Sequence, residues 1–166
     1  MGVGVLGGVP PMSVNRSLRD LFTKCSIAIL AALLARSAPA EELPPYRVEG
    51  DQIPLSLTGQ KGDAARGRAI IASRQTGLCL LCHSGPFPEA GLQGDLAPSL
   101  EGVGNRLSEG QLRLRLVDAR RLSPASLMPA YYKTDGRRDV SPAFAGKPLL
   151  SAAEIEDVVA CLQELR

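Results

Sequence analysis

Small and apolar residues recur at spacings of three and four in three parts of the sequence, the pattern of amphipathic helices. The first part is Asp63–Arg74, with a stripe formed by Ala64, Gly67, Ile70 and Ile71. The second begins at Ser108, with a Gln three residues later, and runs to about Leu122; Leu112, Leu116 and Ala119 share one face. The third begins at the capping box Ser151–Glu154, and its stripe consists of Ile155, Val158, Val159, Leu162 and Leu165. The sequence therefore predicts an all-α fold.

Two segments between these helices, 84–107 and 123–150, are rich in Gly and Pro and predict long loops. Neither strand alternation nor an internal repeat is present in the sequence. We therefore expect one domain of helices and long loops over residues 62–166, preceded by an N-terminal extension at 41–61.

The first forty residues have the pattern of a secretory signal. Basic residues precede an apolar run of ten residues at 26–35; they are Arg16, Arg19 and Lys24. A membrane helix needs roughly twenty apolar residues, so an uncleaved anchor is the weaker alternative. Small residues at Ala38–Ala40 predict cleavage after Ala40, and the residues before Met12 are interpreted as an over-extended start. We expect residues 1–40 to be a signal peptide, and the mature protein to be periplasmic without a stable membrane anchor.

Removing the signal changes the net charge of the protein. The 166 residues carry 19 basic and 17 acidic side chains, whereas residues 41–166 carry 15 and 16, a net charge of −1. Neither balance gives the strongly basic face of a nucleic-acid-binding protein. An aromatic content of 4%, with no Trp, argues against a carbohydrate-binding platform. We therefore expect no nucleic-acid partner.

The cysteines carry the strongest chemical signal. Beyond residue 40 there are three, an odd number that argues against a pure disulfide framework. Two of them lie in Cys79-Leu80-Leu81-Cys82-His83, the C-x-x-C-H pattern in which two thiols form thioethers to haem and the histidine ligates the iron. A thioredoxin-type dithiol would need a βαβ context, and a zinc site would need further Cys or His ligands. The motif therefore predicts one covalent haem c.

The second iron ligand must be a different residue type, because His83 is the single histidine of the chain. Met128 is the one methionine beyond residue 40 and lies in the proline-bracketed segment Pro124–Pro129. A methionine opposite a histidine is typical of electron-transfer cytochromes. A vacant sixth position, a Lys or Tyr ligand, and a Met128 that only fills the core are the alternatives.

Five further segments follow one another in a characteristic order. They are Gln93–Gly104, Gln111–Asp118, Met128–Tyr132, Phe144–Pro148 and Glu156–Ala160. Together with the haem motif they resemble the SoxX family, the monohaem class I c-type cytochrome subunit of the thiosulfate-oxidising SoxAX complex. The resemblance covers nearly all of residues 60–165. Cys161 departs from the family pattern, which would place a larger apolar or aromatic residue there, and we interpret Cys161 as a half-buried packing residue.

The resemblance implies a class I cytochrome c domain in which Pro98 supplies the carbonyl that accepts the proton of the haem histidine. An ordinary turn proline is the alternative. It also implies a heterodimer with a SoxA-type cytochrome subunit that carries the catalytic cysteine. Such an enzyme, an L-cysteine S-thiosulfotransferase, joins thiosulfate oxidatively to a cysteine of a sulfur-carrier protein, and the haem of this chain accepts the electrons. A downstream cytochrome is the other transient partner. A freestanding soluble class I cytochrome c is the alternative function.

Other side chains support several interpretations. Four arginines predict a solvated helix face, with steering of an anionic substrate as the alternative; they are Arg113, Arg115, Arg120 and Arg121. Tyr131 and Tyr132 could pack on the haem, hydrogen-bond its propionates or fill the core. Gly67 is expected where the first helix crosses the last, since Gly in a helix interior needs a steric reason. We expect the partner to dock over the haem edge, beside Cys79 and the Met128–Tyr132 loop.

Overall fold

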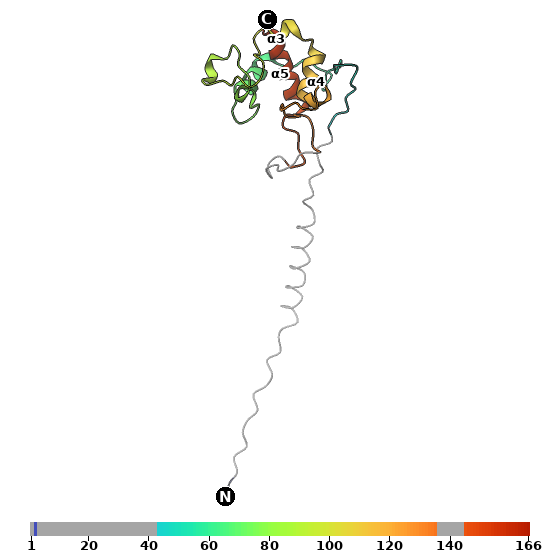
Figure 1. Ribbon diagram of the computed structural model, residues 1–166. Coiled ribbons are helices and arrows are strands. Elements are labelled where there is room, and N and C mark those ends of the chain that lie inside the picture. Colours follow the sequence, from blue (N-terminus) through green and yellow to red (C-terminus); the bar gives the residue numbers. More distant parts are fainter. Residues whose placement is uncertain (1, 3–42, 136–144) are drawn as a thin grey trace. The chain divides into compact units, whose positions relative to one another are not determined.

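The computed structural model describes residues 43–135 and 145–166, together with Gly2 (Figure 1). Residue 43 and those after it belong to one unit. Within the described residues the regular structure is helical, and the one β-type pairing is an isolated bridge between Glu49 and Gln52. This architecture is consistent with a cytochrome c-like fold. The predicted signal peptide lies outside the described residues, apart from Gly2.

Helix α5 (Ala152–Glu164) is the centre of the core and packs against α2, α3 and α4 (Figure 1). Its start is fixed by the predicted capping box: Ser151 accepts from the amide of Glu154, and the Glu154 side chain accepts from the amide of Ser151. All eight residues from Ile155 to Leu162 are buried. A helix buried on this many sides needs neighbours on several faces, which α2, α3 and α4 supply.

Helix α2 (Ala64–Ala72) begins after Asp63, whose carboxylate accepts from the amide of Arg66. It crosses α5 at Gly67, where an added Cβ would collide with the carbonyl of Asp157 and lie 2.9 Å from the Cβ of Cys161. The predicted close approach at Gly67 is confirmed. Cys161 is fully buried at this crossing rather than half-buried, because α2 covers it.

Helix α4 (Glu109–Asp118) has the capping box formed by Ser108 and Gln111, and it continues as the 3-10 helix η3 (Ala119–Arg121). The prediction that Arg113 lies on a solvated face is wrong. Its side chain is only 2% exposed and forms a paired contact with Glu156 of α5, at 2.7 and 2.8 Å. A buried guanidinium needs such a partner, because an uncompensated charge is costly in the interior.

The segment 84–107, predicted as loop, contains two short helices. They are η2 (Pro88–Ala90) and α3 (Val103–Arg106). The α3 turn follows Gly102, whose φ of 65° lies in the left-handed region that favours glycine. A four-residue helix with one buried residue, Val103, is too short to show helical periodicity in a sequence.

The N-terminal segment 43–62 has no helix but joins the core through Ile53 and Leu57, which are both buried. The amide of Ile53 donates to the carbonyl of Gly110 at 3.0 Å, and the amide of Leu57 donates to the Glu156 carboxylate at 2.9 Å. This segment is therefore part of the domain's packing against α4 and α5.

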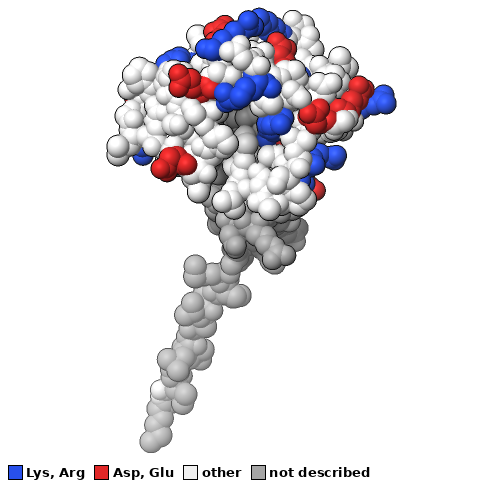
Figure 2. Space-filling view, turned by 45° about the horizontal axis from the view of Figure 1, so that its top comes forward, with Lys and Arg blue, Asp and Glu red and all other residues white. Residues whose placement is uncertain are grey.

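None of the helices in the described ranges is both long enough and apolar enough to cross a bilayer. On the face shown in Figure 2, acidic and basic side chains are interspersed over the described residues.

Candidate haem-binding site

The C-x-x-C-H motif is folded into one tight turn, the 3-10 helix η1 (Cys79–Leu81). The amides of Cys82 and His83 both donate to the carbonyl of Cys79, at 3.2 and 3.0 Å. Both cysteines are free thiols and are half-buried. A turn closed in this way holds the two thiols and the imidazole on one short segment of fixed backbone, from Cys79 to His83.

The His83 ring is oriented by Pro98. Its Nδ1 lies 2.6 Å from the Pro98 carbonyl oxygen, and because a carbonyl can only accept, Nδ1 carries the proton. The other ring nitrogen, Nε2, is then left as the lone-pair donor toward a metal. The structure thus contains the hydrogen bond expected of Pro98, while its role toward a haem stays a prediction.

The loop that carries Pro98 is laid along the motif by main-chain hydrogen bonds. The amide of Ala97 donates to the Cys82 carbonyl at 2.9 Å, and the amide of Leu100 donates to the Ser84 carbonyl at 2.8 Å. Gln93, a residue not predicted to have a role in the site, bridges the amide of Gly85 and the carbonyl of Phe87 with its side-chain amide, at 2.7 and 2.8 Å. A lone Gln in a Gly-rich loop gives no sequence signal for such a bridge.

Tyr131 is distant from the motif in the sequence but lies beside it in the structure. It is buried, and its hydroxyl donates to the carbonyl of Gly77, two residues before Cys79, at 2.7 Å. Of the roles left open for this tyrosine, the structure shows the filling of the core, and the hydrogen bond to Gly77 is an addition that was not predicted. Burial raises the pKa of the neighbouring Cys79 thiol to about 11, so this thiol is protonated at neutral pH.

Met128 is half-buried and packs against the edge of the hydrophobic core. Its amide donates to the hydroxyl of Ser126 at 3.3 Å. Hydrogen bonds connect Cys79, Cys82, His83 and Pro98 directly, whereas Met128 is connected to them through Tyr131, three residues further along the chain. Its ligation of iron stays a prediction.

The residues present fit a covalently held haem. Two free thiols, an imidazole with one nitrogen already satisfied, and a half-buried thioether are the donors that such a group uses. Apolar side chains are exposed on the same segments, including Leu78 just before the motif, Leu81 within it and Leu127 beside Met128. Within the described ranges, no group of three or more His, Cys, Asp or Glu side chains is arranged to hold a metal ion. Two thiols three residues apart, followed by an imidazole, are the set of groups that holds a covalently attached haem.

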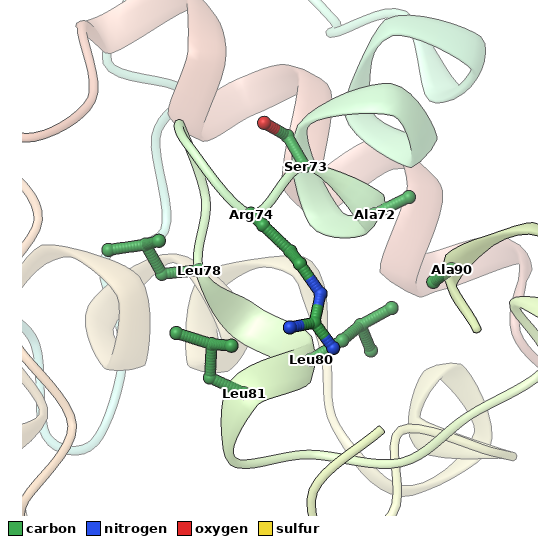
Figure 3. A pocket seen from close by; sticks show the side chains of 7 residues that line it. All are labelled: Ala72, Ser73, Arg74, Leu78, Leu80, Leu81 and Ala90. Carbon is green, nitrogen blue, oxygen red and sulfur yellow. The ribbon is translucent and has the colours of Figure 1, made fainter. Parts of the chain in front are cut away.

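A shallow hollow lies between the end of α2 and the motif turn (Figure 3). In it the Arg74 side chain extends toward Leu80 and Leu81, and its guanidinium donates to the carbonyl of Leu92 at 2.8 Å. Arg74 thereby links the residues that follow α2 to the loop that follows the motif turn.

A helical domain whose C-x-x-C-H turn has its histidine oriented by a main-chain carbonyl has the features of a c-type cytochrome. A solved structure supports this class: the crystal structure of SoxXA from P. pantotrophus is similar at 35% identity over 72% of this chain and 93% of that chain, with a TM-score of 0.67. The chain belongs to the SoxX-like cytochromes and is a Sox-related cytochrome subunit. Neither a family model nor a curated protein matches the sequence.

Proposed function

We propose that this chain is the redox subunit of a periplasmic heterodimeric enzyme that oxidatively joins thiosulfate to a cysteine of a sulfur-carrier protein. The observation that carries the proposal is the oriented motif, with His83 held by Pro98 at 2.6 Å, in a chain 35% identical to one in a SoxXA structure. The partner is a SoxA-type cytochrome subunit, on which the catalytic cysteine is expected.

Each site residue then has a defined task. Cys79 and Cys82 provide the thioethers, and the tight turn of η1 fixes their relative position. His83 offers Nε2 to the iron because Pro98 holds the proton on Nδ1. Met128 would supply the second side-chain ligand. The bound haem supplies one-electron redox chemistry, with a potential raised by methionine ligation.

The chain's own side chains leave little room for other chemistry. Its single histidine and two of the three cysteines beyond residue 40 belong to the site. Burial raises the pKa of the third thiol, Cys161, so it is a poor nucleophile. In the overall reaction the carrier thiol loses a proton, an S–S bond to thiosulfate forms, and two electrons leave. We assign this chain the acceptance of those electrons, one at a time.

The docking surface is proposed on the loops beside the motif. Leu78 is 41% exposed and Leu127 is 80% exposed, on the two segments that carry Cys79 and Met128. Exposed apolar side chains on a restricted backbone are suited to the centre of an interface. Electron transfer weakens steeply with distance, so the surface nearest the haem edge is the one that a donor must reach.

Co-expression with a SoxA-type subunit tests the proposal. We expect the two chains to co-purify as a heterodimer, and Leu78→Asp or Ala130→Glu to weaken association at least tenfold while haem attachment stays complete. Aspartate is chosen because Leu78 has a φ of 58°, which Asp tolerates better than most residues. Leu55→Asp, at an exposed leucine of the N-terminal segment, is the matched control. A wild-type chain that carries haem c but binds no such subunit would favour the freestanding electron carrier.

A further inference from the structure

The main chain of Tyr131 is fixed by three hydrogen bonds. Its amide donates to the carbonyl of Leu116 in α4 at 3.0 Å, and its carbonyl accepts from the amides of Leu149 and Leu150 at 2.8 and 3.1 Å. The residue as a whole is buried, at 4% exposure. Tyr131 is therefore a rigid point in the segment that begins with Met128, and its hydroxyl has little freedom to choose another partner.

The acceptor of that hydroxyl, Gly77, begins a strained turn. Leu78 has a φ of 58° and is the one non-glycine residue with a positive φ among the described residues. A left-handed conformation is unfavourable for a residue that carries a Cβ, and it persists only where surrounding contacts enforce it. Two contacts do so here: the amide of Leu78 donates to Ser73 at 3.1 Å, and Tyr131 donates to Gly77 at 2.7 Å. The strained turn leads directly into Cys79.

We infer that Tyr131 is a positioning residue that fixes the Met128 loop against the haem-attachment turn, through its hydrogen bond to the Gly77 carbonyl. The inference rests on the proposed ligation by Met128. The described hydrogen bonds of the His83 ring do not include Tyr131, so Tyr131 acts on the position of the ligands and not on the imidazole itself.

Haem attachment increases the importance of this bond. In the thiol form, Cys79 Sγ also donates to the Gly77 carbonyl, at 3.4 Å. Conversion of the thiol to a thioether removes that proton, since the sulfur is then bonded to two carbons. Of the hydrogen-bond donors to the Gly77 carbonyl among the described residues, the Tyr131 hydroxyl then remains. Removing its hydroxyl would leave a buried carbonyl without that donor, which is more costly than losing an average hydrogen bond.

The test measures how easily Met128 leaves the iron. Imidazole is titrated into the oxidised holoprotein, and loss of the methionine-to-iron charge-transfer band is followed. Imidazole and Met128 compete for the same position on the iron. The apparent affinity for imidazole therefore rises when the Met128 loop opens more readily. We expect Tyr131→Phe to raise that affinity about tenfold, the ratio given by an unsatisfied buried acceptor. Tyr46→Phe, which removes a hydroxyl from the N-terminal segment, should change it less than twofold.

A second background separates positioning from general destabilisation. In Met128→Ala, imidazole no longer competes with an internal ligand, so adding Tyr131→Phe should change the imidazole affinity less than twofold. The inference is overturned if Tyr131→Phe binds imidazole like the wild type, or if its effect is equally large in the Met128→Ala background. Failure of the proposed function looks different: the wild-type protein itself would lack the methionine band.

Discussion

For the substitution Gly67→Ala, helix propensity predicts a more stable protein, whereas packing predicts a less stable one. Alanine is favoured over glycine in a helix interior by about 1 kcal/mol, so propensity alone predicts stabilisation. The structure predicts the reverse, since the new Cβ would collide with the main-chain carbonyl of Asp157 in α5. A backbone carbonyl in a helix cannot rotate away, so α2 and α5 must separate.

The size of the destabilisation depends on the contacts that are disturbed when α2 and α5 move apart. Overpacking in a well-packed core costs about 1–3 kcal/mol. The two helices are also joined by Asp157, which accepts from the amide of Asp63 at 2.7 Å and from Arg66 at 2.7 and 2.9 Å, and these contacts would lengthen. After the gain in propensity, we expect Gly67→Ala to lower the free energy of unfolding by about 2 kcal/mol, and Gly67→Leu by more.

Guanidinium unfolding of the holoprotein, followed by far-UV circular dichroism, measures this change. The matched control is Ala69→Gly, at an exposed position of the same helix, which should lose about 1 kcal/mol through propensity alone. The packing account predicts that both variants are destabilised, with unchanged denaturant slopes. A Gly67→Ala protein as stable as the wild type, or more stable, would refute the close approach of the two helices.

Three further predictions concern the site and the buried charges. Met128→Ala should abolish the methionine-to-iron charge-transfer band and lower the reduction potential of the holoprotein, measured by redox titration; an unchanged oxidised spectrum would show that Met128 is not the ligand. Arg113→Met should lower the free energy of unfolding by about 3–5 kcal/mol, because it leaves Glu156 buried without its partner. The double variant Arg113→Met with Glu156→Leu should recover most of that loss. Equal losses in the single and the double variant would contradict the role of the buried ion pair. Hydrogen bonding to Arg66 holds the pKa of Asp157 below its ordinary 3.8, so the stability that Asp157 contributes is present above that pH and is lost as the pH falls through the lower folded-state pKa. Asp157→Asn should therefore destabilise the protein at pH 7 and make its stability less dependent on pH in the acid range. An unaltered pH dependence there would exclude Asp157 as its cause.

The helices could be predicted because their signals are local. The capping boxes at Ser108 and Ser151 and the apolar stripes lie within a few residues of the structure that they specify. The burial of Arg113 could not be predicted in the same way, because its partner Glu156 is 43 residues away on another helix. From α4 alone, an arginine between leucines looks like a solvated side chain.

In the site, too, the local features could be predicted from the sequence and the long-range contacts could not. Cys79, Cys82 and His83 are adjacent in the sequence, and their spacing alone points to haem. The bond between Tyr131 and Gly77 spans 54 residues and depends on the strained turn at Leu78, which no periodicity or composition reveals. The bridge made by Gln93 is equally invisible, since a side-chain amide satisfying two backbone groups needs the folded loop around it.

The most direct test of the proposed function is thiosulfate-dependent reduction of this chain's haem in the reconstituted heterodimer. The oxidised complex is mixed with thiosulfate and the sulfur-carrier protein, and the visible haem spectrum is followed together with the mass of the carrier. We predict that the haem of this chain is reduced only when both reactants are present, while the carrier cysteine gains one thiosulfate. Carrier modification with this haem still oxidised, or no modification by a complex that retains its haem, would contradict the assignment of this chain as the electron acceptor.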